Sequence, residues 1–310
     1  MNHWFLRKNS RRYLRMDMPV HLHITPAVPV ENSEISATGF DYFPLSVTQN
    51  LSKQRQSIYD WLNKIQTEKS TLRPIFENII NSIELLEEGI KNASKGINPN
   101  KNMPYKKKMN EHLKGCKELN ALKEKAPNTY HQIKLVEDKI LFFMTEFFNN
   151  INNSTPKNFQ LHQEKKGFFE YDKTINELSD PRFKKNSLVQ AILALSTFMD
   201  NLIQYYLMFN EDHAIQQDFK RWPLINANLS ACGVALISRR KFKKHEGVKI
   251  YLSFPESQDK LLLNGSITDI RQLNEHQERI AINFEFPEGK IQDLLIFKVQ
   301  NYELNQCIKE

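Results

Sequence analysis

Apolar and polar residues alternate in two widely separated parts of the chain. Residues 18–24 alternate between apolar side chains and either polar side chains or proline, and the pattern returns at 248–254, 261–267 and 280–286. A period of two is typical of β-strands with one buried face. Turn-forming residues separate the later strands, which favours an antiparallel barrel or sandwich. A last segment, 291–299, is expected to form a closing helix.

The middle of the chain has a helical period instead. Apolar residues recur at alternating intervals of four and three in three long seams, which begin at Ile58, Ile133 and Leu188. A shorter amphipathic piece lies around 109–122. Such regular seams predict long helices that pack side by side, within one chain or between chains. Pro74 lies inside the first seam, so we expect that helix to kink or restart there.

These periods divide the chain into three zones. They are a basic arm with the first strand (1–46), a helical, coiled-coil-like region (47–217) and the remaining strands (218–310). The fold class is therefore α+β. A single amino-terminal strand needs partner strands to bury its apolar face, so we expect both chain ends to form one barrel.

The helical zone allows two interpretations. Its seams either pack on each other in a monomeric bundle or mediate self-association of the chain. We favour a homo-oligomer, a dimer or tetramer, because several regular seams carry more apolar surface than is needed to cover a small barrel.

Composition narrows the class of protein and of partner. The chain has 310 residues, of which 40% are hydrophobic and 25% charged, as in ordinary globular proteins. The net charge of +7 favours an anionic partner, either a nucleotide, a nucleic acid or a membrane surface. Three widely spaced cysteines argue against a disulfide framework and favour a cytoplasmic location. Polar residues interrupt the most apolar stretch, 188–209, so we expect no membrane span.

Two short motifs carry candidate binding chemistry. The first, Arg11-Arg12-Tyr13-Leu14-Arg15, directly precedes the first strand. Guanidinium groups make bidentate hydrogen bonds to phosphate and to the O6/N7 edge of guanine, and they stack on purines. A basic arm that is simply solvated is the alternative interpretation.

The second motif, residues 228–233, has the form N-x-S-x-x-G and lies between two expected strands. Asn228 and Ser230 are two residues apart, so in an extended strand their side chains share one face and offer an amide and a hydroxyl at the barrel surface. Gly233 suits either a positive φ or a close backbone approach. The alternative is an Asx-type turn without a ligand.

In content and order, the two motifs and the strands around them resemble the PilZ family. The resemblance covers residues 1–25 and 221–310. It implies a six-stranded antiparallel PilZ-type β-barrel, interrupted here by the helical region, and cyclic di-GMP as the ligand. It also implies six ligand-binding residues, in which the arm holds guanine and phosphate and the turn meets the second face of the ligand: Arg11, Arg12, Arg15, Asn228, Ser230 and Gly233.

The chain departs from the family pattern in the long helical insertion and in the asparagine that opens the turn. The insertion resembles that of tetrameric PilZ-like proteins, some of which lack the ligand motifs. Since both motifs are present in this chain, we expect a cyclic di-GMP receptor or effector of a bacterial surface process such as motility, pili, biofilm formation or virulence. The alternative is a ligand-blind oligomeric scaffold that acts through protein–protein contacts.

Other classes have weaker support in the sequence. The chain contains no nucleophile elbow, P-loop, H-E-x-x-H or paired-carboxylate signature, so we expect no enzyme and no cofactor. His21 and His23 share the outward face of a strand without an evident third ligand, so we expect solvent-facing histidines and no metal. The basic run 239–244 either adds attraction for a nucleotide or forms a solvated loop. DNA binding is not expected, because no recognised motif is present.

Overall fold

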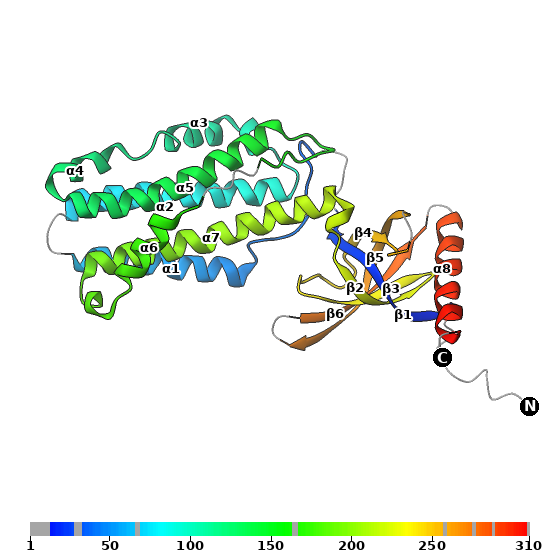
Figure 1. Cartoon of the computed structure of the whole chain (residues 1–310). Helices are drawn as coiled ribbons and strands as arrows, with labels where there is room; N and C mark the ends of the chain where they lie inside the picture. The colour runs from blue at the N-terminus through cyan, green and yellow to red at the C-terminus, as the bar shows by residue number, and fades with distance from the viewer. Residues whose placement is uncertain are drawn as a thin grey trace, which may run out of the picture. The chain divides into compact units, whose positions relative to one another are not determined.

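The structure is a computed structural model, and it describes most of the chain. The described residues are 13–27, 33–65, 69–162, 167–256, 259–274, 277–286 and 289–308. They form two compact units (Figure 1): the chain ends, Met1–Ala27 and Ile215–Glu310, build one unit, and Val28–Ala214 build the other. The stretch 33–46, which the sequence grouped with the first strand, belongs to the second unit.

The first unit contains a closed six-stranded antiparallel barrel. Its strands are β1 (Arg15–Pro26), β2 (Leu224–Ser230), β3 (Gly233–Ser238), β4 (Gly247–Ser253), β5 (Lys260–Asn274) and β6 (Gln277–Glu285). Their order around the barrel is β1-β2-β3-β6-β5-β4. The expected α+β class, with a barrel assembled from both chain ends, is confirmed.

Strand β1 closes the barrel because it pairs with two different strands. Its residues 15–21 pair with β2, and its residues 21–26 pair with β4. The alternating apolar side chains of β1 are buried, with exposed fractions of 7% or less, while the side chains between them face outward. The buried set is Met18, Val20, Leu22 and Ile24. The period of two therefore predicted both the strand and its inward face.

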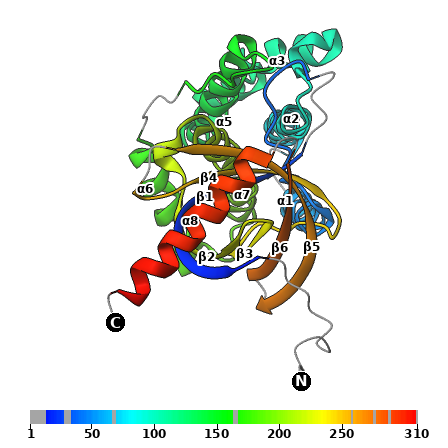
Figure 2. The ribbon, with the colours of Figure 1, turned by 90° about the vertical axis from the view of Figure 1, so that its right-hand side faces the viewer.

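Helix α8 (Gly289–Cys307) packs against this barrel. It contacts β1 and β2, and Figure 2 shows it lying across them. Leu295 and Val299 are its buried residues, and Lys298 Nζ lies 3.3 Å from an Asp259 carboxylate oxygen, ahead of β5. The helix expected at 291–299 is confirmed and extends further in both directions.

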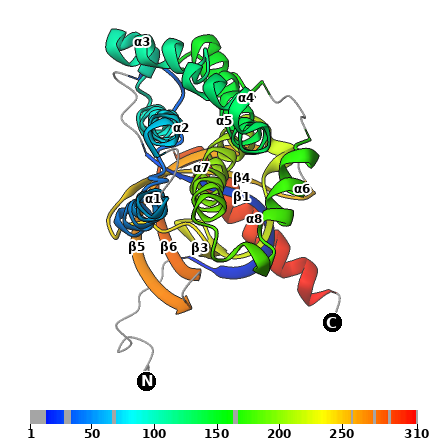
Figure 3. The ribbon, with the colours of Figure 1, turned by 90° about the vertical axis from the view of Figure 1, so that its left-hand side faces the viewer.

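The second unit is helical. Its α-helices are α1 (Leu45–Lys64), α2 (Lys69–Ser94), α3 (Met103–His112), α4 (Leu122–Lys125), α5 (Pro127–Asn153), α6 (Phe169–Leu178) and α7 (Ser187–Gln217), the last of which runs on into the barrel unit. Short 3₁₀ turns are η3 (Pro99–Lys101), η4 (Lys117–Ala121) and η5 (Pro181–Phe183), with η6 (Phe219–Arg221) in the barrel unit. Figure 3 shows α7 nearly end-on, among α1, α2, α5 and α6.

The predicted seams are buried within a single chain. Ile79 and Ile83 of α2 are 1% and 0% exposed, and Leu195 of α7 is 0% exposed. Aromatic rings join the helices, since the Tyr206 ring of α7 lies 6.0 Å from the Phe147 ring of α5. The seams therefore need no second chain to bury them, which removes the reason for which self-association was favoured. Self-association stays a prediction.

Two helix boundaries differ from the expected ones: the helix does not restart at Pro74, and the piece around 109–122 is not one continuous helix. The first seam breaks after Lys64, where α1 ends, and not at Pro74, which lies inside α2. Pro74 sits in the second turn of α2, so its missing N–H costs that helix a single hydrogen bond near its start. The piece expected around 109–122 is the end of α3, a turn and η4.

Buried polar groups of α7 have partners on neighbouring segments. Tyr42 donates to Asp212 at 2.7 Å, and Tyr206 donates to Glu146 of α5 at 3.1 Å. Such pairing lowers the cost of burying polar groups in a helix core. Among the described residues, no helix is long and apolar enough to span a bilayer.

Candidate ligand-binding site

The barrel brings the two sequence motifs together on its outer face. In the antiparallel pairing of β1 with β2, Arg15 lies directly opposite Ser230, and Asp17 lies directly opposite Asn228. Side chains of directly opposed residues point to the same side of a sheet. Because Met18 and Val20 face inward, Arg15 and Asp17 face outward, and so does Asn228 of β2, which is half-buried.

Asn228 makes a cross-strand hydrogen bond inside this group. Its Nδ2 donates to Asp17 Oδ1 at 2.9 Å. Asp17 is exposed and Asn228 is half-buried, so the pair is open to solvent at the barrel surface. Arg15, also exposed, lies two residues before Asp17 on the same face and supplies a positive charge beside the pair.

Ser230 lies at the turn of the β2–β3 hairpin and is differently placed. Its side chain is fully buried, and its hydroxyl donates to the Gly233 carbonyl oxygen at 3.1 Å. The Cys232 N–H in turn donates to Ser230 Oγ at 3.4 Å. The expectation that Ser230 offers its hydroxyl at the barrel surface is therefore wrong, because that hydroxyl holds the turn together.

Gly233 starts β3 opposite Ser230 and also pairs with Asn283 of β6. A Cβ added at Gly233 would lie 2.3 Å from the carbonyl oxygen of Ile282, far closer than ordinary van der Waals contact. The glycine is therefore required by the close approach of the β6 backbone, which is one of the two reasons the sequence allowed. Its φ is not in the positive range.

Only one of the three arginines of the arm lies within the described residues. Arg15 begins β1, whereas Arg11 and Arg12 lie outside the described residues. Of the six expected ligand residues, the barrel thus brings together Arg15, Asn228, Ser230 and Gly233. 

The two histidines of β1 are not the solvent-facing residues that we expected. His21 Nδ1 donates to the carbonyl oxygen of Trp222 at 2.9 Å. The ring centroid of His23 lies 5.8 Å from that of Tyr251, and burial, followed by the nearby charge of Arg240, lowers the pKa of His23 to about 4. His23 is therefore neutral near pH 7 and does not add to the positive charge of the outer face.

Arg240 is half-buried and close enough to His23 to affect its pKa, whereas Arg239, Lys241, Lys243 and Lys244 are exposed. The basic run is therefore mostly a charged surface loop between β3 and β4, as the second interpretation of this run expected.

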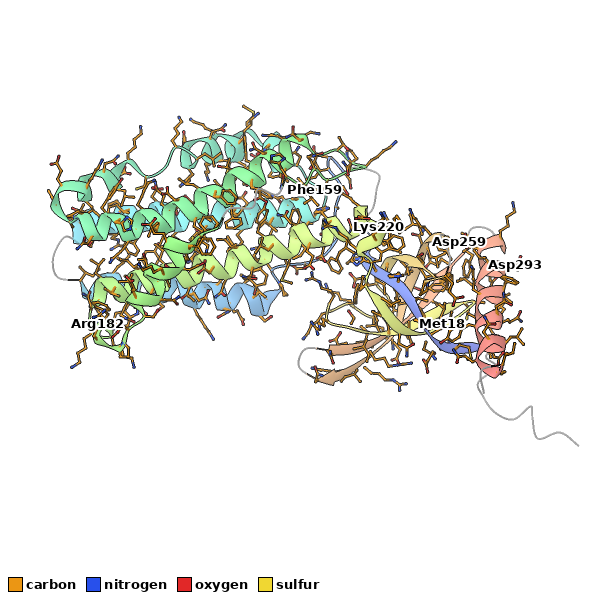
Figure 4. The ribbon with its side chains drawn as sticks, viewed as in Figure 1. Met18, Phe159, Arg182, Lys220, Asp259 and Asp293 are labelled. Carbon is orange, nitrogen blue, oxygen red and sulfur yellow. The ribbon has the colours of Figure 1, made fainter. Side chains whose placement is uncertain are left out.

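A groove lies between α8 and the barrel. It has a volume of about 220 Å³ and is lined by Pro19 of β1, Phe254 after β4, and Phe297 and Asn301 of α8, among others. Figure 4 shows Met18, another lining residue, next to α8. Pro19 is outward-facing and lies two residues after Asp17 on β1, but Arg15, Asp17, Asn228, Ser230 and Gly233 are not among the described residues that line the groove.

Within the part of the chain that the structure describes, no group of three or more potential metal ligands is present. Comparison with known proteins finds no family model, no curated protein and no solved structure that matches this chain. The interpretation of the site therefore depends on its own chemistry.

Sequence reasoning missed Asp17 as a member of the site. Its position on the outward face was visible in the alternation of residues 18–24, but its partner was not, because the register between β1 and β2 is a property of the folded barrel.

Proposed function

We propose that the barrel unit is a PilZ-type domain that binds cyclic di-GMP on its outer face, where β1, β2 and β3 meet. The chain would act as a receptor or effector of a bacterial surface process such as motility, pili, biofilm formation or virulence. The observation that carries this proposal is the register that sets Arg15 opposite Ser230 and Asp17 opposite Asn228. It joins two motifs that come from opposite ends of the chain.

The chemistry of the group suits a cyclic dinucleotide, which presents two phosphates and two purine bases. Arg15 offers a guanidinium for phosphate or guanine, and the chain before it, with Arg11 and Arg12, continues directly from the start of β1. Asn228 offers an amide on the neighbouring strand, and Gly233 keeps the adjoining hairpin tight against β6. The net charge of +7 favours an anionic ligand.

A second candidate function is the ligand-blind scaffold, which would act through protein–protein contacts. Two observations favour it: the Ser230 hydroxyl is already bonded within the hairpin, and α8 exposes apolar side chains. Phe297 and Leu304, seven residues apart on one side of α8, are 57% and 59% exposed.

Calorimetric titration of the full chain with cyclic di-GMP decides between the two functions. The receptor proposal expects saturable binding that Arg15→Ala weakens about tenfold or more, because hydrogen bonds to charged groups are worth about 1.5–3 kcal/mol. Arg271→Ala is the matched control, since the Arg271 side chain on β5 is 72% exposed and bonded to Asp269. It should leave the affinity nearly unchanged.

Absence of binding heat at high micromolar ligand would end the receptor proposal and leave the scaffold. Binding that Arg15→Ala leaves unaltered would place the ligand elsewhere on the protein. The proposed dimer or tetramer is tested separately by sedimentation of the same preparation.

A further inference from the structure

The cross-strand pair of Asp17 and Asn228 has a defined polarity. The two residues are directly opposed in the β1–β2 register, and the Asn228 amide nitrogen donates to Asp17 Oδ1 at 2.9 Å. Both side chains are on the outer face of the barrel, where Asp17 is exposed. No other described pair in the β1–β2 register sets an acid opposite an amide.

The chemistry of this pair fixes which way the amide points. An ionised carboxylate only accepts hydrogen bonds, whereas an asparagine side chain has a donating NH₂ end and an accepting oxygen end. The accepting oxygen would be repelled by Asp17, so the NH₂ end must face the carboxylate. Asn228 Oδ1 is therefore turned away from Asp17 and is held as a hydrogen-bond acceptor. Without Asp17, the amide could present either end.

We propose that Asp17 is a positioning residue that makes this site select guanine over adenine. The inference rests on the proposed function and specifies the base that the site accepts. The Watson–Crick edge of guanine carries two adjacent donors, N1–H and the N2 amino group, which match a fixed acceptor. The same edge of adenine places the N1 acceptor there, which would meet the oxygen of Asn228 without a hydrogen bond. A site with a fixed buried or oriented polar group rejects the ligand that leaves this group unpaired.

The charge of Asp17 must be separated from its effect on the amide. Asp17 repels the phosphates of any cyclic dinucleotide, so its removal should strengthen binding generally. Cyclic di-GMP and cyclic di-AMP carry the same two phosphates, so this effect is the same for both. The ratio of the two affinities therefore reports the orientation of the amide and not the charge.

The test is a titration of the full chain with cyclic di-GMP and with cyclic di-AMP, for wild type and Asp17→Ala. The wild type should prefer cyclic di-GMP, and Asp17→Ala should lower the preference about tenfold, as expected for one lost directional hydrogen bond at the base edge. Asp293→Ala is the matched control, because Asp293 is an exposed acid on α8, labelled in Figure 4, whose loss changes the net charge equally. It should leave the ratio unchanged.

A reciprocal exchange gives a second, independent readout. Asp17→Asn combined with Asn228→Asp puts the donor on β1 and the carboxylate on β2, where its second oxygen still offers an acceptor. This double variant should restore the preference for guanine. The single change Asn228→Asp sets two carboxylates opposite each other and should weaken binding of both ligands.

The outcomes separate the two proposals. If the wild type binds cyclic di-GMP and Asp17→Ala leaves the ratio as it was, the inference about Asp17 is overturned and the proposed function stands. A double variant that fails to regain the preference, while thermal melting shows it folded, also overturns the inference. If the wild type binds neither dinucleotide, both proposals fall.

Discussion

Replacement of Gly233 by alanine tests the most tightly packed point of the barrel. The added methyl carbon would lie 2.3 Å from the carbonyl oxygen of Ile282 and 3.3 Å from its carbonyl carbon. Ordinary van der Waals contact begins at about 3.4 Å, so the strands must separate by about 1 Å. Both obstacles are backbone atoms of β6, and they cannot move aside as a flexible side chain could.

The cost follows from what this separation breaks. Overpacking of a well-packed site costs about 1–3 kcal/mol. The hydrogen bond from Phe284 N to Cys232 O, 2.9 Å long, lies next to the clash, and its loss adds about 1 kcal/mol. We therefore expect Gly233→Ala to lower the stability of the barrel unit by about 3 kcal/mol, which corresponds to a fall in its melting temperature of roughly 10 °C.

The control is Gly289→Ala, because a Cβ at Gly289 would meet nothing within 4 Å and the residue begins α8. Alanine is the better helix former, so this variant should melt at or slightly above the wild-type temperature. Differential scanning calorimetry measures both shifts, and hydrogen exchange in peptides from β3 and β6 locates the change. The reasoning would be refuted by a Gly233→Ala protein that melts within a degree of the wild type with unchanged exchange in β6.

Two further predictions concern the helical unit. His213 is fully buried and stacked on Phe159 with ring centroids 3.9 Å apart, and burial lowers the pKa of His213 from 6.5 to about 3. Below pH 6.5, His213 is protonated in the unfolded chain but stays neutral in the folded chain. The free energy of unfolding therefore falls as the pH falls, by about 2 kcal/mol at pH 5. His213→Phe should therefore raise the melting temperature more at pH 5 than at pH 8, and equal shifts at both values would contradict this assignment. Ile83 is 0% exposed, so Ile83→Ala should lower the free energy of unfolding of the helical unit by about 2–5 kcal/mol, measured by urea titration. Sedimentation should show no smaller species before the variant unfolds. Dissociation before unfolding would instead support the interpretation that this seam mediates self-association.

The barrel was predictable from the sequence because each strand has one buried face. In β1, the apolar residues from Met18 to Ile24 alternate without interruption, and all four are buried. The pairing of this strand with two partners was not predictable, because alternation specifies which face is buried and leaves the neighbouring strand open. The Asp17–Asn228 pair depends on that register, so the sequence could not reveal it.

The sequence predicted the long helices, but it did not show whether the same chain or a second chain buries their apolar seams. A seam such as the one from Ile58 to Ile90 indicates a partner helix, and it is the same whether the partner belongs to this chain or to another. The structure shows these residues buried by their own chain. Ser230 presents the same difficulty on a smaller scale, since a serine at a hairpin can bind a ligand or its own backbone, and here it bonds Gly233.

The insertion between β1 and β2 has a consequence for how the barrel forms. His21 bonds the carbonyl of Trp222 across 201 residues, and closing a flexible loop of that length costs about 5 kcal/mol of chain entropy. A folded helical unit removes most of this cost, because its own packing already restricts the segment between the two barrel parts. The pairing of β1 should therefore depend on the helical unit, although β2 to β6 follow one another closely in sequence. Ile83→Ala should lower the hydrogen-exchange protection of β1 more than that of the β5–β6 hairpin. Equal protection of both in this variant would show that the barrel closes without help from the bundle.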